Sequence, residues 1–303
     1  MILAYDCIPC VVSHIVHMSQ LATDDDELRH HIITRALNNL TDIDYTLTPP
    51  EHAARLHRVI YDVMGTMDIY REIKDRSTEV AHALLPEMRA VLAGRDHSFE
   101  ALIRLVIAGN IIDIGADRHF KLEGVRDRLL EVFDMPINTR AIAELETAMD
   151  NAKSIFYIAD NCGEAVFDRL LIERYRDKIT LGVRGRPVLN DVTPREAVMS
   201  GLDIVPMIDT GDSAPGVSLR SSRPEFLEAL RGADLIVSKG QGNFESLCDE
   251  DLPIFYLLRV KCKVISEMLD GAELGSLQVI NHAERRKKHE ARKKCGSACV
   301  HTA

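Results

Sequence analysis

The chain has 303 residues, and with 46% hydrophobic and 28% charged residues it can bury a core beneath a solvated surface, which excludes disorder along its whole length. Its net charge of -10 disfavours a nucleic-acid partner, because an acidic surface repels phosphates, although a small phosphorylated ligand can still bind locally. It has no run of about 18 apolar residues, and residues 1–10 lack the basic and long apolar regions of a signal peptide, so we expect a cytoplasmic protein without a membrane partner.

The first half of the sequence predicts helices. Acidic residues open the segment 24–40, and its apolar residues then recur at helical spacing. Pro49 opens a second long helix, since proline is tolerated in a first turn. Similar patterns cover residues 78–92, 98–112, 126–133 and 139–152. We therefore expect a helical N-terminal domain over residues 1–150.

From about residue 153, short apolar runs alternate with helical patterns. The expected strands are 154–159, 179–183, 203–208, 235–238 and 254–260. This alternation predicts parallel strands joined by right-handed crossovers, so residues 151–282 should form an α/β domain with a doubly wound, mostly parallel sheet. The basic segment 283–303, which contains Cys295 and Cys299, should be a poorly ordered tail.

Oxygen-bearing side chains follow the first expected strand. Asp160 and Asn161 come directly after it, and Gly163 and Glu164 then open a helix. Ligands of open parallel sheets bind beyond the carboxyl ends of the strands, and such oxygens suit a hard divalent cation. The alternative interpretation is that Asp160 or Asn161 only caps the following helix.

A second carboxylate follows the second expected strand. Asp191 could share a cation with the first pair, or it could cap a helix that begins near Thr193. Arg184 and Arg186 lie in the same loop and could offset the charge of a phosphate.

The third and fourth strand ends also carry features suited to an anion. The small-residue loop 209–218 could present backbone N–H groups to an anion, and Lys239 could hold a phosphate or simply extend into solvent. Together the four strand ends carry the groups needed for metal-assisted phosphoryl transfer to water.

These segments resemble the damage-control phosphatase family, long catalogued as a domain of unknown function. The resemblance spans about residues 5–275. Its most specific elements are Asp160-Asn161-Cys162-Gly163-Glu164, Asn190-Asp191 with Thr193, and Lys239-Gly240 with Asn243 and Glu245. The segment 108–113 and the Cys7-Ile8-Pro9-Cys10 motif, typical of the prokaryotic branch, also look similar to family elements.

The resemblance implies that Asp160, Asn161 and Asp191 bind a divalent metal ion, which could be magnesium, manganese, cobalt or nickel. It further implies that Lys239 holds the substrate phosphate and that Glu164 and Asn243 line the site. The implied substrates are small phosphate esters, such as sugar phosphates or damaged phosphometabolites. Two routes stay open, since either a metal-activated water or Asp160 itself could attack phosphorus.

Asn110 and Asp113 lie three residues apart on one face of an apolar helix. They could form a structural polar pair at the domain junction or support the active site. We place them with Arg184 and Asn243 among the expected substrate-binding residues.

The cysteines leave several interpretations open. Seven cysteines spread over a long chain disfavour a disulfide framework. Cys7 and Cys10, with His14 and His17 nearby, could form a metal site shared with the tail, a redox pair or ordinary buried thiols. Cys162 is expected to be a packing residue. Two rival functions are a binding module for a phosphometabolite or nucleotide, without turnover, and a redox protein built on Cys7 and Cys10. The oligomeric state is left open.

Overall fold

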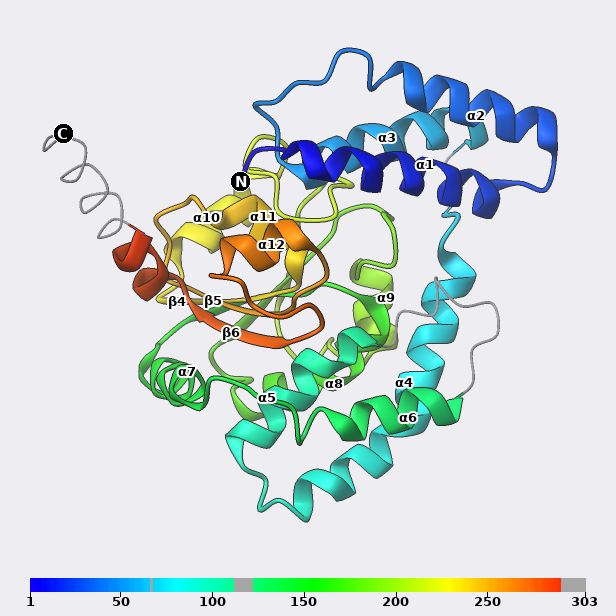
Figure 1. Ribbon diagram of the computed structural model, residues 1–303. Coiled ribbons are helices and arrows are strands. Elements are labelled where there is room, and N and C mark those ends of the chain that lie inside the picture. The colour runs from blue at the N-terminus through cyan, green and yellow to red at the C-terminus, as the bar shows by residue number, and fades with distance from the viewer. Residues whose placement is uncertain (66–67, 112–121, 290–303) are drawn as a thin grey trace, which may run out of the picture.

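The computed structural model describes residues 1–65, 68–111 and 122–289 (Figure 1). Its first half is helical, as predicted. The elements are η1 (Tyr5–Cys7), α1 (Ile8–Ala22), α2 (Asp26–Asn38), α3 (Pro49–Met64), α4 (Arg71–Ala93), α5 (Phe99–Ala108), η2 (Gly109–Ile111), α6 (Leu122–Glu131) and α7 (Thr139–Asn151). Local sequence fixes several helix starts. Asp25 caps α2, and Thr48 forms a reciprocal capping box with Glu51 at α3.

One six-stranded sheet forms the second half of the fold, in the order β3-β2-β1-β4-β5-β6. The strands are β1 (Ile155–Ile158), β2 (Ile179–Val183), β3 (Met207–Asp209), β4 (Leu235–Lys239), β5 (Ile254–Arg259) and β6 (Leu277–Asn281). β1 to β5 are parallel and β6 is antiparallel to β5, which confirms the predicted mostly parallel α/β class. The strand order reverses between β1 and β4, where sheets of this kind bind ligands.

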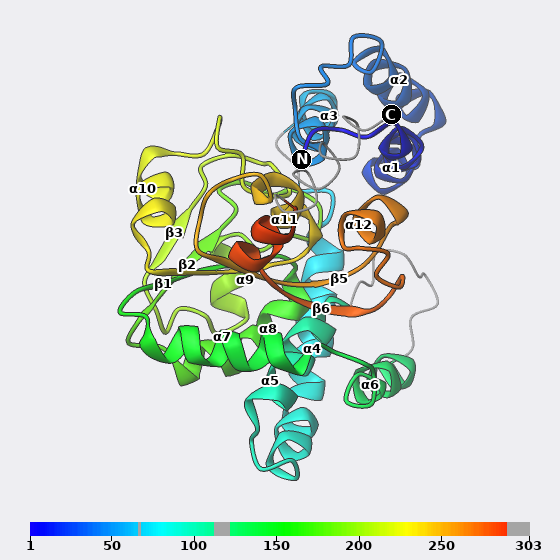
Figure 2. The ribbon, with the colours of Figure 1, turned by 60° about the vertical axis from the view of Figure 1, so that its left-hand side comes forward.

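Alternate residues of the strands face two different hydrophobic clusters, because successive strand side chains point to opposite faces. Ile155 and Tyr157 of β1 pack with α4, α5, α7 and α8 (Cys162–Arg174) on one face. Phe156 and Ile158 pack with α10 (Pro224–Gly232), α11 (Gln241–Leu247) and α12 (Lys263–Met268) on the other. Figure 2 shows these two helical layers on either side of the sheet.

Helices α1 to α3 form a smaller cluster of their own around Ile15, Ile32 and Ile60. α4, α5 and α7, by contrast, share the core of the sheet. Residue 150 thus marks the change from helices to alternating strands and helices. The main hydrophobic core, however, contains residues from both sides of this position. α3 contacts α11, and the Tyr61 hydroxyl donates to the Pro187 carbonyl at 2.9 Å, so α3 lies against the segments that follow β2 and β4.

Three details differ from the sequence-based expectation. β3 begins at Met207, later than the predicted strand 203–208. Pro206 lacks the N–H that a ladder requires, and only its carbonyl pairs with β2. β6 was not predicted. In the basic tail, residues 282–289 are helical, and the Arg285 guanidinium lies 5.1 Å from the centre of the Phe244 ring. Residues 290–303, with Cys295 and Cys299, lie outside the described residues.

None of the helices within the described ranges combines the length and the apolar character that crossing a bilayer requires.

Candidate active site

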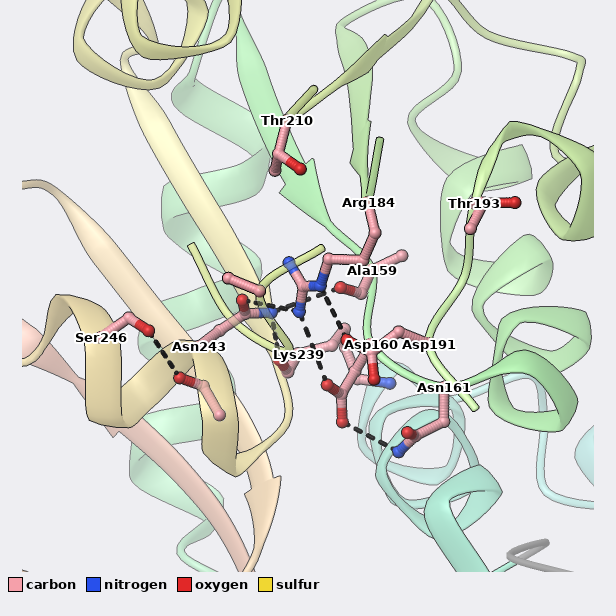
Figure 3. A network of polar contacts seen from close by, with 12 residues as sticks. Ala159, Asp160, Asn161, Arg184, Asp191, Thr193, Thr210, Lys239, Asn243 and Ser246 are labelled. Carbon is pink, nitrogen blue, oxygen red and sulfur yellow. Dashed lines mark hydrogen bonds and ion pairs between the residues drawn. The ribbon is translucent and has the colours of Figure 1, made fainter. Parts of the chain in front are cut away.

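Two loops from neighbouring strands meet at the carboxyl edge of the sheet (Figure 3). Asp160 and Asn161 directly follow β1, and Asp191 lies in the loop after β2. Asn161 and Asp191 form an isolated antiparallel bridge, and the Val192 N–H donates to the Asp160 carbonyl at 2.9 Å. This backbone pairing brings the three expected metal ligands side by side.

Helix capping does not use these side chains. Asn161 occupies the N-cap position of α8, but its side chain makes no capping hydrogen bond. The N-cap of α9 (Pro194–Met199) is Thr193, which forms a capping box with Glu196, so Asp191 is free of that role. The Asn161 amide instead donates to the Asp160 carboxylate at 2.9 Å, which leaves the amide oxygen available for a ligand.

Arg184 links the groups of the site although it is almost completely buried. Its Nε donates to Asp191 Oδ2 at 2.7 Å, and its Nη2 donates to Asn243 Oδ1 at 3.0 Å and lies 3.8 Å from Asp160 Oδ1. Its Nη1 is buried and has no hydrogen-bond partner among the described residues. Such a buried donor requires an acceptor, and an oxygen of a phosphate can provide one.

Asn243, on α11, holds the ends of β1 and β4 together. Its amide nitrogen donates to the Lys239 carbonyl at 2.7 Å and to the Ala159 carbonyl at 3.3 Å, while its oxygen accepts from Arg184. The side chain is fully buried, and both of its polar atoms are engaged. It therefore orients Arg184.

Lys239 is buried and neutralised by carboxylates. Its ammonium donates to Glu164, to Asp168 at 2.7 Å and to the Val106 carbonyl at 2.9 Å. Two negative charges and a carbonyl already satisfy all three of its donors. The arrangement therefore differs from the expected lysine that points into an open crevice to hold phosphate.

The strand period explains this position of Lys239. Leu235 and Val237 face the cluster that contains α8, so Lys239, two residues further along, points to the same face. Sequence reasoning did not find Asp168. A signal was present, because Asp168 lies four residues after Glu164 and therefore on the same face of the α8 helix.

Asn110 bridges two carboxylates at the base of the site. Its amide nitrogen lies 3.2 Å from Glu164 Oε2 and 3.4 Å from Asp160 Oδ2, and its oxygen is buried without a partner among the described residues. Gly109 permits this approach, since a Cβ atom there would lie 2.9 Å from the Glu164 Cα. Asp113 lies outside the described residues.

The site carries an excess of negative charge. Burial above all, and then the charges of Asp191 and Glu164, raise the pKa of Asp160 to about 8. Burial also raises the pKa of Asp191, although Arg184 acts in the opposite direction. Buried carboxylates destabilised in this way favour a bound cation, which would offset their mutual repulsion.

The donor atoms fit a hard divalent cation. Asp160 and Asp191 provide carboxylate oxygens, and Asn161 provides an amide oxygen. Within the parts of the chain that the structure describes, no group of three or more His, Cys, Asp or Glu side chains is placed to hold a metal ion. A metal at this site would therefore depend on the Asn161 amide as a third protein ligand.

Side chains of the loop 209–218 accept hydrogen bonds from part of the loop's own backbone. The Gly211 N–H donates to Asp209 at 2.8 Å, and the Ala214 N–H donates to Asp212 at 3.3 Å. These N–H groups are thus not free to hold an anion as expected. Arg186 is exposed at the surface, unlike the buried Arg184.

The thiols of the N-terminal Cys7 and Cys10 are free. Cys7 is half-buried and Cys10 is exposed, so a metal or redox role for them stays a prediction. His57, which sequence reasoning missed, lies fully buried with its ring centre 5.5 Å from that of His14. Burial lowers the pKa of His14 to about 4 and that of His57 to about 3. Cys162 is a buried packing residue, as expected.

Comparison with known proteins covers almost the whole chain. The profile of the damage-control phosphatase ARMT1-like domain matches residues 3–277. A damage-control phosphatase of Archaeoglobus fulgidus is 33% identical over 283 residues, which cover 89% of this chain and 96% of that protein. A damage-control phosphatase of Pyrococcus horikoshii is 29% identical over 272 residues, or 88% and 93% of the two chains. The crystal structure of a DUF89 family protein from Pyrococcus horikoshii is similar to this chain with a TM-score of 0.82 and 28% sequence identity. The match covers 93% of this chain and 99% of that chain.

Proposed function

Because the chain belongs to the damage-control phosphatase ARMT1-like domain family, we propose that it is a phosphatase that hydrolyses small phosphate monoesters with a divalent cation bound to Asp160, Asn161 and Asp191. The observation that carries this proposal is the meeting of these three side chains at one edge of the sheet, beside the buried Arg184, whose Nη1 has no hydrogen-bond partner among the described residues. Their oxygens suit a hard cation such as magnesium, manganese, cobalt or nickel.

The residues of the chain have separable roles in this proposal. The bound cation would supply charge neutralisation at the phosphate and activation of an attacking group. Arg184 binds a phosphate oxygen through Nη1, and its bonds to Asp191 and Asn243 hold it in position. The N-terminus of α8, which begins at Cys162, directs its positive end toward the same place. Asn110 donates to both Glu164 and Asp160 and so helps to orient Asp160.

Two routes of attack are compatible with this arrangement. In one, a water molecule attacks phosphorus and the phosphate is released directly. In the other, Asp160 attacks phosphorus, the alcohol leaves, and water hydrolyses the aspartyl phosphate. Mass spectrometry after a single turnover distinguishes them, because only the second route adds a phosphoryl group to Asp160.

A panel of small phosphomonoesters, assayed with each divalent ion and with a chelator, tests the proposal. We expect metal-dependent release of phosphate and a loss of at least about 100-fold in kcat for Asp160→Asn and for Asp191→Asn. Asp209→Asn is the matched control. Asp209 ends β3 at the same edge of the sheet but pairs with Arg223 at 3.0 Å, so its replacement should leave activity within about twofold. Binding of phosphoesters without any turnover would instead identify a non-catalytic binding module.

A further inference from the structure

A pocket lies between α3 and the loops that follow β2 and β3. Its volume of about 530 Å³ is within the range of sites that hold small metabolites. Arg58 and Asp62 line it from α3, and Arg186 and Asp212 line it from the two loops. None of the three expected metal ligands lines this pocket, so the proposed chemistry gives it no role.

One loop borders both the pocket and the candidate active site. Arg184 and Asp191, at the two ends of this loop, belong to the candidate site, and Arg186 lies between them and lines the pocket. The Cα atoms of Arg184 and Arg186 are at most about 7.6 Å apart, since each of the two residue steps spans about 3.8 Å. A substrate of the size of a sugar phosphate can therefore place its phosphate at Arg184 and its other end in the pocket.

Hydrogen bonds hold the walls of the pocket together. The Tyr61 hydroxyl donates to the Pro187 carbonyl at 2.9 Å, which joins α3 to the loop after β2. The Thr210 hydroxyl accepts from the Gly185 N–H at 3.0 Å and donates to Asp212 Oδ1 at 2.8 Å, which joins that loop to the one after β3. The pocket is thus preformed, and its position relative to Arg184 is fixed by bonds to the adjacent residue.

Positive charge in the pocket exceeds the negative charge available to balance it. Arg58 and Arg186 are exposed, and neither guanidinium forms an ion pair or a hydrogen bond with another of the described residues. Asp212 already accepts hydrogen bonds on both carboxylate oxygens. Asp62 has no such bond within the same part of the chain, so two guanidinium groups share the pocket with one unengaged carboxylate. In a chain of net charge -10, this local excess favours an anionic ligand.

We propose that this pocket binds the non-reacting end of the substrate, and that Arg58 and Arg186 select substrates that carry a second oxyanion at that end. This inference rests on the proposed phosphatase function and specifies the substrate class of the same site. Arginine suits this role, because its planar guanidinium binds an oxyanion through two parallel hydrogen bonds. The substrates favoured are therefore phosphate monoesters with a remote carboxylate or a second phosphate.

Two substrates of equal length test this assignment. Phosphogluconate and sorbitol phosphate, each phosphorylated on the terminal hydroxyl, differ at the opposite end, where the first has a carboxylate and the second a hydroxyl. With Mn²⁺ we expect the wild type to have a kcat/KM at least about tenfold higher for phosphogluconate, as for a charge-assisted hydrogen bond. Arg58→Gln and Arg186→Gln should each lower this ratio several-fold, and Arg186→Glu should bring it below one, because the new carboxylate repels that of the substrate.

Arg231→Gln is the matched control. Arg231 is also exposed and without an ion pair among the described residues, but it lies on α10 and does not line the pocket, so the wild-type ratio should persist. Equal kcat/KM for the two substrates in the wild type would overturn the assignment, and so would hydrolysis of p-nitrophenyl phosphate alone. A ratio that Arg58→Gln and Arg186→Gln leave unchanged would overturn it as well. Absence of metal-dependent hydrolysis of all three compounds would instead refute the proposed function, and this inference with it.

Discussion

Gly240 allows the end of β4 to approach Asp160. Its φ of 78° is a conformation that residues with a Cβ atom rarely adopt, and a Cβ atom would clash with the Asp160 carboxylate. Gly240 also directly follows Lys239. The backbone at Gly240 therefore connects the buried ion cluster to the expected metal ligands. At the scale of single residues, the geometry of the site thus depends on a position that has no side chain.

Gly240→Ala should reduce activity and stability together. The positive φ with an extended ψ of 166° costs an alanine about 1–3 kcal/mol, and the clash would also displace Asp160. Gly271→Ala is the matched control, because Gly271 has a φ of 84° with no atom within 4 Å of an added Cβ. We expect both variants to lose about 1–3 kcal/mol in urea unfolding, whereas only Gly240→Ala should lose kcat, by at least about tenfold. Equal kcat in the two variants would contradict the role given to Gly240.

The loop between β2 and α9 is the element that positions Asp191. At its end, Thr193 and Glu196 form a capping box, and the Thr193 N–H donates to Glu196 at 3.1 Å. Glu196 also lies 3.4 Å from the buried ammonium of Lys74 on α4. The helical first half of the chain therefore braces the loop that carries an expected metal ligand.

Thr193→Ala should weaken metal binding as well as stability. Loss of an N-cap side chain typically lowers the free energy of unfolding by about 1 kcal/mol. Thr193 lies two residues after Asp191, so the loss of its cap should also loosen the loop that carries Asp191. Thr48→Ala removes the capping box at the start of α3 and serves as the control. Chemical denaturation should show similar losses for both variants. Mn²⁺ titration should show a several-fold weaker affinity for Thr193→Ala alone, and equal affinities in the two variants would argue against this coupling.

At the scale of the whole molecule, a cluster of charged side chains is buried between α8 and the sheet. Asp168, Glu164 and Lys239 are almost completely inaccessible, and two carboxylates share one ammonium. Burial raises the pKa of Asp168 to about 7, and the charge of Glu164 adds to this shift while Lys239 opposes it. Since the ordinary pKa of an aspartate is 3.8, the folded protein binds one more proton than the unfolded chain between about pH 4 and pH 7.

Global stability should therefore depend on pH through Asp168. The contribution of a raised pKa is complete below about pH 4 and is lost as pH rises toward 7, with a slope of at most about 1.4 kcal/mol per pH unit. Asp168→Asn should remove this slope, because an amide does not titrate. Denaturant unfolding of both proteins at pH 5, 6, 7 and 8 measures the difference between them. A constant difference over this range would mean that Asp168 is ionised throughout.

The class of the fold and the principal chemical groups could be derived from local patterns. Apolar runs alternating with helical patterns indicate a parallel sheet, and such sheets collect strand-end residues at one edge. Asp160, Asn161 and Asp191 could be proposed as neighbours on that basis. Their positions after consecutive strands were sufficient for this prediction, because adjacent parallel strands have their carboxyl ends next to each other.

Only the tertiary structure decided which charges remain available at that edge. The alternation along β4 turns Lys239 toward α8, where Asp168 lies one helical turn beyond Glu164. The orientation of Arg184 depends on Asn243, which is 59 residues away in sequence and accepts a hydrogen bond from its Nη2. Local sequence determines strands, helices and caps through short-range sterics and periodicity, whereas ion pairing and burial depend on contacts between distant segments that arise only when the sheet assembles.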